Sequence, residues 1–331
     1  MNAKIYPGLA LAAALAAFSV FVTNVLPYHL IGASVLSLLI GMLINPFISK
    51  YNCFDAGIGF TSKKVLRLAI ILMGLSLSFS QVVEVGRISL VVMIFTLLTA
   101  FLGGYIVGKL LRLDWKLAGL LSAGTGICGG SAIAAVGPVI EAEDSAMAYA
   151  ISATFIFDVF MVVLFPIMGS FLKMTDLGFG LWTGTAINDT SSVVAAGYSF
   201  SEVAGNYSVI VKLTRTLAIV PVVLVFSIIH ARVAKKDSKR KVDISKVFPW
   251  FILLFIAMVA VKSTGLIPDA VSLSVSNFSR FLMVMALGAI GLKTSFQKLA
   301  QAGVAPLLHG FTISIAVVVV SFIIQVFLGQ V

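Results

Sequence analysis

Long apolar segments alternate with short polar breaks along almost the whole of the 331-residue chain. Most of these segments approach or exceed the roughly 18 apolar residues that a helix needs to cross the hydrocarbon core of a bilayer. The pattern predicts an all-α, polytopic membrane protein that forms a single integral membrane domain over residues 1–331. The predicted segments are 8–27, 30–48, 64–80, 88–111, 117–140, 145–171, 177–200, 206–231, 248–266, 278–294 and 304–328.

Two of these segments are interrupted by residues that are unfavourable inside helices. Segment 117–140 contains Gly-Thr-Gly-Ile-Cys-Gly-Gly-Ser at Gly124–Ser131, and segment 177–200 echoes it with Gly-Thr-Ala-Ile-Asn-Asp-Thr-Ser at Gly184–Ser191. Glycine is conformationally permissive, and short polar side chains compete for backbone hydrogen bonds. Freed backbone groups are tolerated in a bilayer only inside protein or beside a water-filled cavity. We therefore expect two discontinuous or re-entrant helices at a binding site; glycines that merely allow close helix packing are the alternative.

Each interruption creates new helix ends. A helix N-terminus leaves N–H groups free and carries the positive end of the helix dipole, which favours anions. Hydroxyl side chains at such an end cap the helix or donate to a bound oxyanion. The candidate substrate-binding residues in the two interruptions are Gly124, Thr125, Gly126, Cys128, Gly129, Gly130, Ser131, Asn188, Thr190, Ser191 and Ser192.

Four ionisable residues lie well inside apolar segments, where a charge is costly and usually functional. Others near segment ends, namely Lys262, Arg280 and Lys293, are expected to be interface anchors. Asp158 is expected either to carry a coupling ion or to be the buried partner of Lys212 or Arg215. Lys212 and Arg215 are three residues apart and share one helix face, so both are candidate substrate-binding residues. Snorkelling to the membrane interface is the favoured interpretation for Lys212. Arg215 lies deeper, and its planar fork suits bidentate contact with an oxyanion. Asp189 is the second candidate for the coupling proton or sodium ion.

Composition supports a membrane location. Hydrophobic residues make up 60% of the chain and charged residues 11%, whereas soluble domains contain about 25% charged residues. The net charge of +10 comes mainly from Lys and Arg between the apolar segments, so it sets orientation and does not indicate a nucleic-acid partner. Basic residues follow the second, fourth, eighth and tenth segments; they include Lys63, Lys64 and Arg67 after the second, and Lys293 and Lys298 after the tenth. The positive-inside rule therefore predicts a cytoplasmic N-terminus and a C-terminus on the outer side of the membrane.

The charge pattern does not decide whether the two interrupted segments cross the membrane. If both cross, the chain has eleven spans; if both are re-entrant hairpins, it has nine. The main basic connections keep the same sidedness in both cases.

A second repeat suggests inverted symmetry. The stretch Gly-Leu-Ser-Leu-Ser-Phe at Gly74–Phe79 recurs as Gly-Leu-Lys-Thr-Ser-Phe at Gly291–Phe296. The first copy ends a span that runs outward and the second a span that runs inward. Oppositely oriented copies are typical of the inverted repeats of transporters.

Motifs for catalysis and metal binding are absent from the sequence. There is no Walker A, HExxH or GxSxG motif, and the two cysteines, Cys53 and Cys128, form no CxxC pair. We therefore expect no enzyme activity, no metal site and no cofactor. Cys128 or Ser131 as an enzymatic nucleophile is disfavoured, because no general base is recognisable nearby.

The two interrupted stretches resemble those of the YeiH-like family of bacterial membrane proteins, which are described as sulfate exporters. The matching stretches are 121–135 and 183–197, and Val211–Arg215 and the Gly74-Leu75 turn agree as well. More distantly, that family is similar to the superfamily of cation/proton antiporters, bile-acid symporters and glutamate/sodium symporters. The resemblance implies inverted repeats, broken helices and often a core domain that moves against a scaffold. Here the core would lie around 117–231 and the remaining helices would form the scaffold.

These features together predict a secondary active transporter of a small anion, such as sulfate or an organosulfonate. It would be coupled to protons or sodium and work by alternating access. Its partners would be the solute and the lipid bilayer, and a homodimer is an assembly that the sequence allows. The alternatives are a proton- or sodium-coupled antiporter whose cargo is a cation bound by both aspartates, and a channel.

Overall fold

The computed structural model describes residues 5–25, 32–233, 248–294 and 303–330, and within these ranges every regular element is a helix. Six helical stretches are long and apolar enough to cross a membrane. They are α1 (Tyr6–Val25), α5 with α6 (Phe79–Leu110), α9 (Asp144–Phe171), α12 with α13 (Glu202–Val233), α16 (Asp269–Lys293) and α18 (Val304–Phe327). The prediction of an all-α polytopic membrane protein is confirmed.

The other helices are shorter or are joined by irregular turns. They are α2 (Ala33–Ile48), α3 (Asp55–Phe60), α4 (Leu66–Met73), α7 (Trp115–Ala123), α8 (Gly130–Val136), α10 (Asp176–Ala186), α11 (Thr190–Phe200) and α15 (Phe251–Ser263). One π-helical turn joins α3 to α4 at Thr61–Val65, and a second joins α5 (Phe79–Leu98) to α6 (Gly104–Leu110) at Thr99–Gly103. Each of these pairs is therefore one continuous helix.

One predicted loop is wrong. Lys63, Lys64 and Arg67 were expected in the connection after the second apolar segment, but they lie on the helix that begins at Asp55. The basic residues of 234–247, and Lys298, lie outside the described residues.

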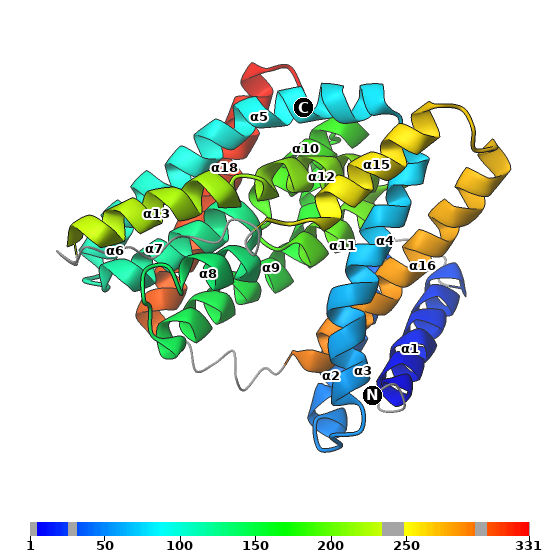
Figure 1. The fold of residues 1–331 in the computed structure, drawn as a ribbon, viewed down its shortest axis with the longest axis horizontal. Coiled ribbons are helices and arrows are strands. Elements are labelled where there is room, and N and C mark those ends of the chain that lie inside the picture. The colour runs from blue at the N-terminus through cyan, green and yellow to red at the C-terminus, as the bar shows by residue number, and fades with distance from the viewer. Residues whose placement is uncertain (1–4, 26–31, 234–247, 295–302, 331) are drawn as a thin grey trace.

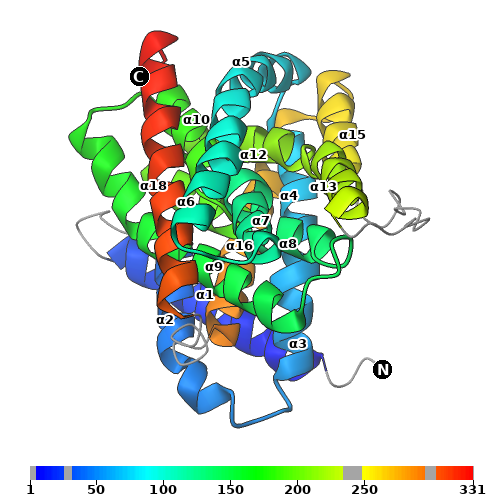
Figure 2. The same cartoon turned by 90° about the vertical axis from the view of Figure 1, so that its left-hand side faces the viewer.

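The first interrupted segment is a re-entrant hairpin, here named hairpin A (residues 115–136). It consists of α7, a π-helical turn at Gly124–Cys128, and α8, and its two arms pack against each other (Figures 1 and 2). The Nζ of Lys116, at the start of α7, donates a hydrogen bond to the backbone oxygen of Glu141, beyond α8, at 2.8 Å. The chain therefore enters and leaves at the same end of the molecule.

The second interrupted segment is also a re-entrant hairpin, hairpin B (residues 176–200), formed by α10 and α11. The Ser201 hydroxyl donates to a carboxylate oxygen of Asp176 at 2.5 Å, which joins the two ends of the hairpin. The rings of Phe179 and Phe200 stack with their centroids 4.0 Å apart. These contacts close the base of hairpin B.

The two hairpins enter from opposite ends of the molecule. Helix α9 connects them, and its 28 residues extend for about 42 Å at the rise of an α-helix. The base of hairpin A lies at the first end of α9 and the base of hairpin B at the other. The hairpin form of both segments agrees with the re-entrant alternative, while the number of spans stays a prediction. Opposed entry is what an inverted repeat requires, but the repeat itself stays a prediction, and Phe296 of the second repeat lies outside the described residues.

The helices pack into two groups (Figure 1). The flanking group contains α1–α4, α15 and α16, and the hairpin group contains α5–α13 and α18. In the flanking group α2 and α16 approach so closely that a Cβ on Gly291 would lie 2.1 Å from the backbone oxygen of Leu38. Small residues allow such packing in membranes. The hairpin group therefore contains the segment 117–231 expected as a core, together with α5, α6 and α18. A core that moves against a scaffold stays a prediction.

Candidate functional site

The tips of the two hairpins meet beside the middle of α9. Hairpin A turns at Gly129, whose backbone has φ 61° and ψ −130°, a conformation that glycine adopts without strain. A Cβ on Gly129 would lie 3.3 Å from the Cβ of Asp189 at the tip of hairpin B. The two interrupted stretches recognised in the sequence are therefore direct neighbours in space.

Asp158 holds the tip of hairpin B from α9. One carboxylate oxygen accepts the backbone N–H of Asn188 at 2.9 Å, and the other accepts that of Asp189 at 2.8 Å. The side chain is fully buried. A negative charge placed here stabilises the N–H groups that the helix break leaves free. One alternative from the sequence was an ion pair of Asp158 with Lys212 or Arg215. Among the described residues Asp158 forms neither ion pair and accepts backbone N–H groups instead.

Lys212 holds both tips from α12 (Glu202–Thr216). Its ammonium group donates to the backbone oxygen of Ile127 at 2.8 Å and to that of Ile187 at 3.0 Å. The residue has no exposed surface. The expectation that Lys212 snorkels to the membrane interface is therefore wrong. Its ammonium group instead donates hydrogen bonds to carbonyl groups that the two helix breaks leave unpaired.

Arg215, one turn further along α12, also donates hydrogen bonds to the backbone of both hairpins. Its Nε donates to the oxygen of Gly126 at 2.7 Å, and its Nη1 to that of Thr185 at 2.6 Å. Further donation reaches the oxygens of Ile187 and Thr125, and the side chain is only 1% exposed. This geometry differs from the expected bidentate contact with an anion, because the guanidinium already donates to the backbone of both hairpins.

Asp189 caps the first turn of α11. One of its carboxylate oxygens accepts the backbone N–H of Ser191 at 2.8 Å and also the hydroxyl of the same residue. A capping carboxylate at a helix start is favourable because it satisfies a free N–H and the positive dipole end. Asp158 and Asp189 border the same cavity, but Asp189 is only partly buried whereas Asp158 is fully buried.

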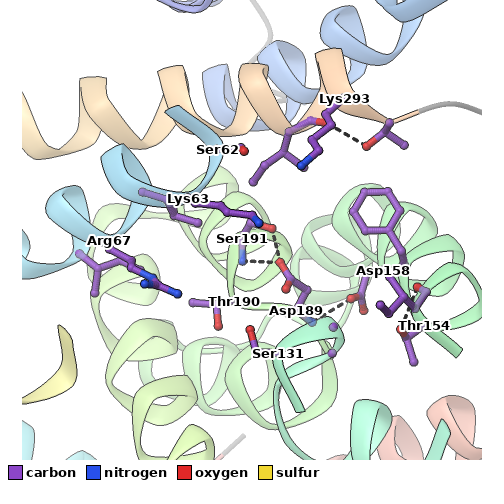
Figure 3. Close-up of a pocket in the computed structure, with 18 of the residues that line it drawn as sticks. Ser62, Lys63, Arg67, Ser131, Thr154, Asp158, Asp189, Thr190, Ser191 and Lys293 are labelled. Atoms are coloured by element: carbon purple, nitrogen blue, oxygen red, sulfur yellow. Dashed lines mark hydrogen bonds between the residues drawn. The ribbon is translucent and has the colours of Figure 1, made fainter. Parts of the chain in front are cut away.

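A cavity of about 320 Å³ lies between the hairpin tips and the flanking group (Figure 3). Seven residues predicted for the site line it: Gly129, Gly130, Ser131, Asp158, Asp189, Thr190 and Ser191. Eight predicted residues lie outside its lining: Gly124, Thr125, Gly126, Cys128, Asn188, Ser192, Lys212 and Arg215. The structure therefore separates residues that border open space from residues that hold the tips together.

Three basic residues on the opposite wall were not expected at the site. Lys63 and Arg67 come from the helix formed by α3 and α4, and Lys293 comes from the end of α16. The sequence analysis had assigned them to membrane orientation or to interface anchoring. Their only signal in the sequence is the spacing of four between Lys63 and Arg67, which places both on one helix face.

A larger cavity of about 1190 Å³ shares this wall and the two tips. It also contains Cys128 and follows α8 to Glu141 and His230, at the base of hairpin A. The site is therefore reached from the end of the molecule where hairpin A enters. No cluster of three or more His, Cys, Asp or Glu side chains suited to a metal occurs in the described residues.

Comparison with known proteins places the chain among bacterial membrane proteins. A family model described as "Conserved hypothetical protein 698" matches residues 7–310. A "UPF0324 membrane protein" of Clostridium tetani is 65% identical, covering 98% of this chain and 97% of the relative. Relatives of the same description in Streptococcus agalactiae and Fusobacterium nucleatum are 39% and 36% identical, over 98% and 91% of this chain and 97% and 92% of their own lengths.

Proposed function

The chain belongs to the UPF0324 family of membrane proteins, and from its site we propose that it is a secondary transporter of a small anion. Sulfate or an organosulfonate is the proposed cargo, in keeping with the resemblance to the YeiH-like sulfate exporters. Transport would occur by alternating access, with the hairpin group moving against the flanking group.

The observation that carries this proposal is the meeting of two opposed re-entrant hairpins beside a cavity. Irregular backbone at this depth is tolerated where it is buried in protein or lines a water-filled space. Such breaks near the midplane commonly form the solute sites of secondary transporters. Here Asp158, Lys212 and Arg215 hold both tips rigid, so that the first turns of α8 and α11 border the cavity.

The charges around the cavity favour an anion over a cation. Lys63, Arg67 and Lys293 line it, against two carboxylates, and both oxygens of Asp158 already accept backbone N–H groups. One carboxylate oxygen of Asp189, Oδ1, takes no part in the helix cap. We therefore assign the coupling proton or sodium ion to Asp189 in preference to Asp158.

The positive-inside rule supports an orientation for this transporter. With a cytoplasmic N-terminus, the base of hairpin A and the cavity would face the cytoplasm, and hairpin B would enter from the periplasm or the cell exterior. The protein would act in the bacterial inner membrane, alone or as a homodimer.

Uptake of radiolabelled sulfate and of a labelled organosulfonate into proteoliposomes tests the proposal. We expect accumulation above that of protein-free liposomes, driven by an imposed proton or sodium gradient. Asp189→Asn should uncouple flux from that gradient. Absence of flux for every anion tested, in folded protein, would overturn the proposal.

A cation antiporter is the second candidate, because Asp158 and Asp189 lie side by side at the tips. Ligand-dependent thermal stabilisation separates the two, since a ligand that binds the folded state raises its apparent stability. Stabilisation by sodium or lithium but by no oxyanion would favour the cation.

A further inference from the structure

Three cationic side chains face the hairpin tips from the flanking group without a counter-ion. The side chains of Lys63, Arg67 and Lys293 make no hydrogen bond or ion pair with any residue in the described part of the chain. The Arg67 guanidinium lies over the Phe251 ring, 5.7 Å from its centroid. Cations that border a cavity without a partner are available to a ligand.

Two of these side chains extend towards hairpin B, and the third borders the same cavity. In Figure 3, Lys63 extends towards Ser191, Arg67 extends towards Thr190, and Lys293 lies above them on the same cavity. The two helices that carry them, α4 with its preceding turn and α16, pack against each other. The flanking group therefore presents the three charges as one surface.

The opposite wall supplies neutral donors. The hydroxyls of Ser131 and Thr190 line the cavity, and the first turn of the eleven-residue helix α11 carries the positive end of its dipole. Arg offers a planar fork and Lys a mobile ammonium group, and both bind oxyanions through charge-assisted hydrogen bonds. Hydroxyl and N–H donors suit oxygen acceptors as well.

The charges around the cavity indicate the sign of its ligand's charge. Lys63, Arg67 and Lys293 contribute three positive charges, against the two carboxylates of Asp158 and Asp189. Both oxygens of Asp158 already accept backbone N–H groups of hairpin B. The positive excess, carried by side chains that have no counter-ion, favours an anion.

We propose that Lys63, Arg67 and Lys293 are the specificity-determining contacts for a compact oxyanion, which is bound between the two helix groups. This inference rests on the proposed function, because it names the residues that bind the cargo at the same site. The flanking group supplies the charge and the hairpin group supplies the hydroxyl donors. Lys212 and Arg215 act through the backbone of the tips and do not touch the anion.

Binding of sulfate to the purified protein tests the assignment. The variants Lys63→Gln, Arg67→Gln and Lys293→Gln are compared with Lys64→Gln, a matched control on the same exposed stretch that does not line the cavity. Calorimetry with sulfate should show a loss of affinity of about tenfold to hundredfold for each cavity variant, the range for a lost hydrogen bond to a charged group. The control should keep the wild-type affinity. Melting temperatures without ligand should match in all four variants, because these side chains are exposed.

Anion selectivity gives a second readout. The wild-type protein should bind sulfate more tightly than chloride, which has no oxygen acceptors, and Arg67→Gln should reduce this preference. Sulfate affinity that is unchanged in all three cavity variants would overturn the inference, even if the wild-type protein transports an anion. Sulfate that binds as expected but produces no flux in proteoliposomes would instead overturn the proposed function.

Discussion

Hairpins A and B begin from similar sequences but break their helices by different means. Hairpin A turns through a π-helical turn and Gly129, at a positive φ. Hairpin B turns through extended backbone at Ile187, and Asp189 caps its second arm. The polar groups at the tip of hairpin B are held on both sides: its carbonyls by Lys212 and Arg215, its N–H groups by Asp158.

The tip of hairpin A is held in a different way. Its carbonyls at Thr125, Gly126 and Ile127 accept hydrogen bonds from α12. In the described residues, however, no carboxylate accepts the backbone N–H groups at the start of α8 as Asp158 does at the tip of hairpin B. The comparison teaches that α12 is the shared support of both tips, whereas α9 supports hairpin B specifically. Substitutions at these supports should therefore affect the stability of the two hairpins differently.

Arg215→Ala should have the largest effect, because it releases both tips. The change leaves buried carbonyls of Thr125, Gly126 and Thr185 without a donor. An unsatisfied buried group costs about 1–3 kcal/mol, so we expect several kcal/mol of lost stability and a strongly lowered melting temperature in detergent. A melting temperature within about one degree of wild type would contradict this shared support. Arg215→Lys retains one donor group, so its melting temperature should lie between those of the wild type and Arg215→Ala.

Asp158→Asn should weaken hairpin B alone. The amide keeps one acceptor oxygen but places an NH₂ group against a backbone N–H that the carboxylate now accepts. Loss of one hydrogen bond to a charged group corresponds to about 1.5–3 kcal/mol. Hydrogen exchange should increase at Asn188 and Asp189 and stay unchanged at 124–129. Equal increases at both tips would show that the supports are not separate.

Gly129→Ala should destabilise hairpin A by about 1–3 kcal/mol, because a side chain at this φ is strained and its Cβ would contact Asp189. Gly130→Ala is the matched control: its Cβ would meet nothing nearer than Ile151 at 3.8 Å. Alanine in place of a helical glycine stabilises by about 0.5–1 kcal/mol. Thermal unfolding should therefore shift in opposite directions for the two variants. A shift of the same sign would argue against the turn described for Gly129.

Asp189→Ala should have the smallest effect on stability, about 0.5–2 kcal/mol, through loss of the cap on α11. Asp189→Asn should be close to wild type in thermal unfolding, because asparagine caps a helix about as well as aspartate. If both variants lose the same stability, the carboxylate charge matters more than the cap.

The positions of the two helix breaks, and the burial of Asp158, could be predicted from sequence because Gly, Asn and Asp are unusual within apolar segments. Re-entry could not be predicted, because both topologies place the basic connections on the same sides. The role of Arg215 could not be predicted either, since its partners are backbone carbonyls that any sequence would carry. Lys63, Arg67 and Lys293 were missed because their position at the cavity depends on how α4 and α16 pack against the hairpin group.

The hairpin arms have a consequence for how the chain enters the membrane. They contain 9, 7, 11 and 11 residues, fewer than the roughly 20 that a spanning helix needs. None of them is long enough to leave the insertion machinery for lipid as a stable span of its own. Helices such as α9 and α12 with α13 should therefore be inserted first, and the hairpins should enter later by folding between them. Biogenesis of this protein thus ends with the assembly of its own site.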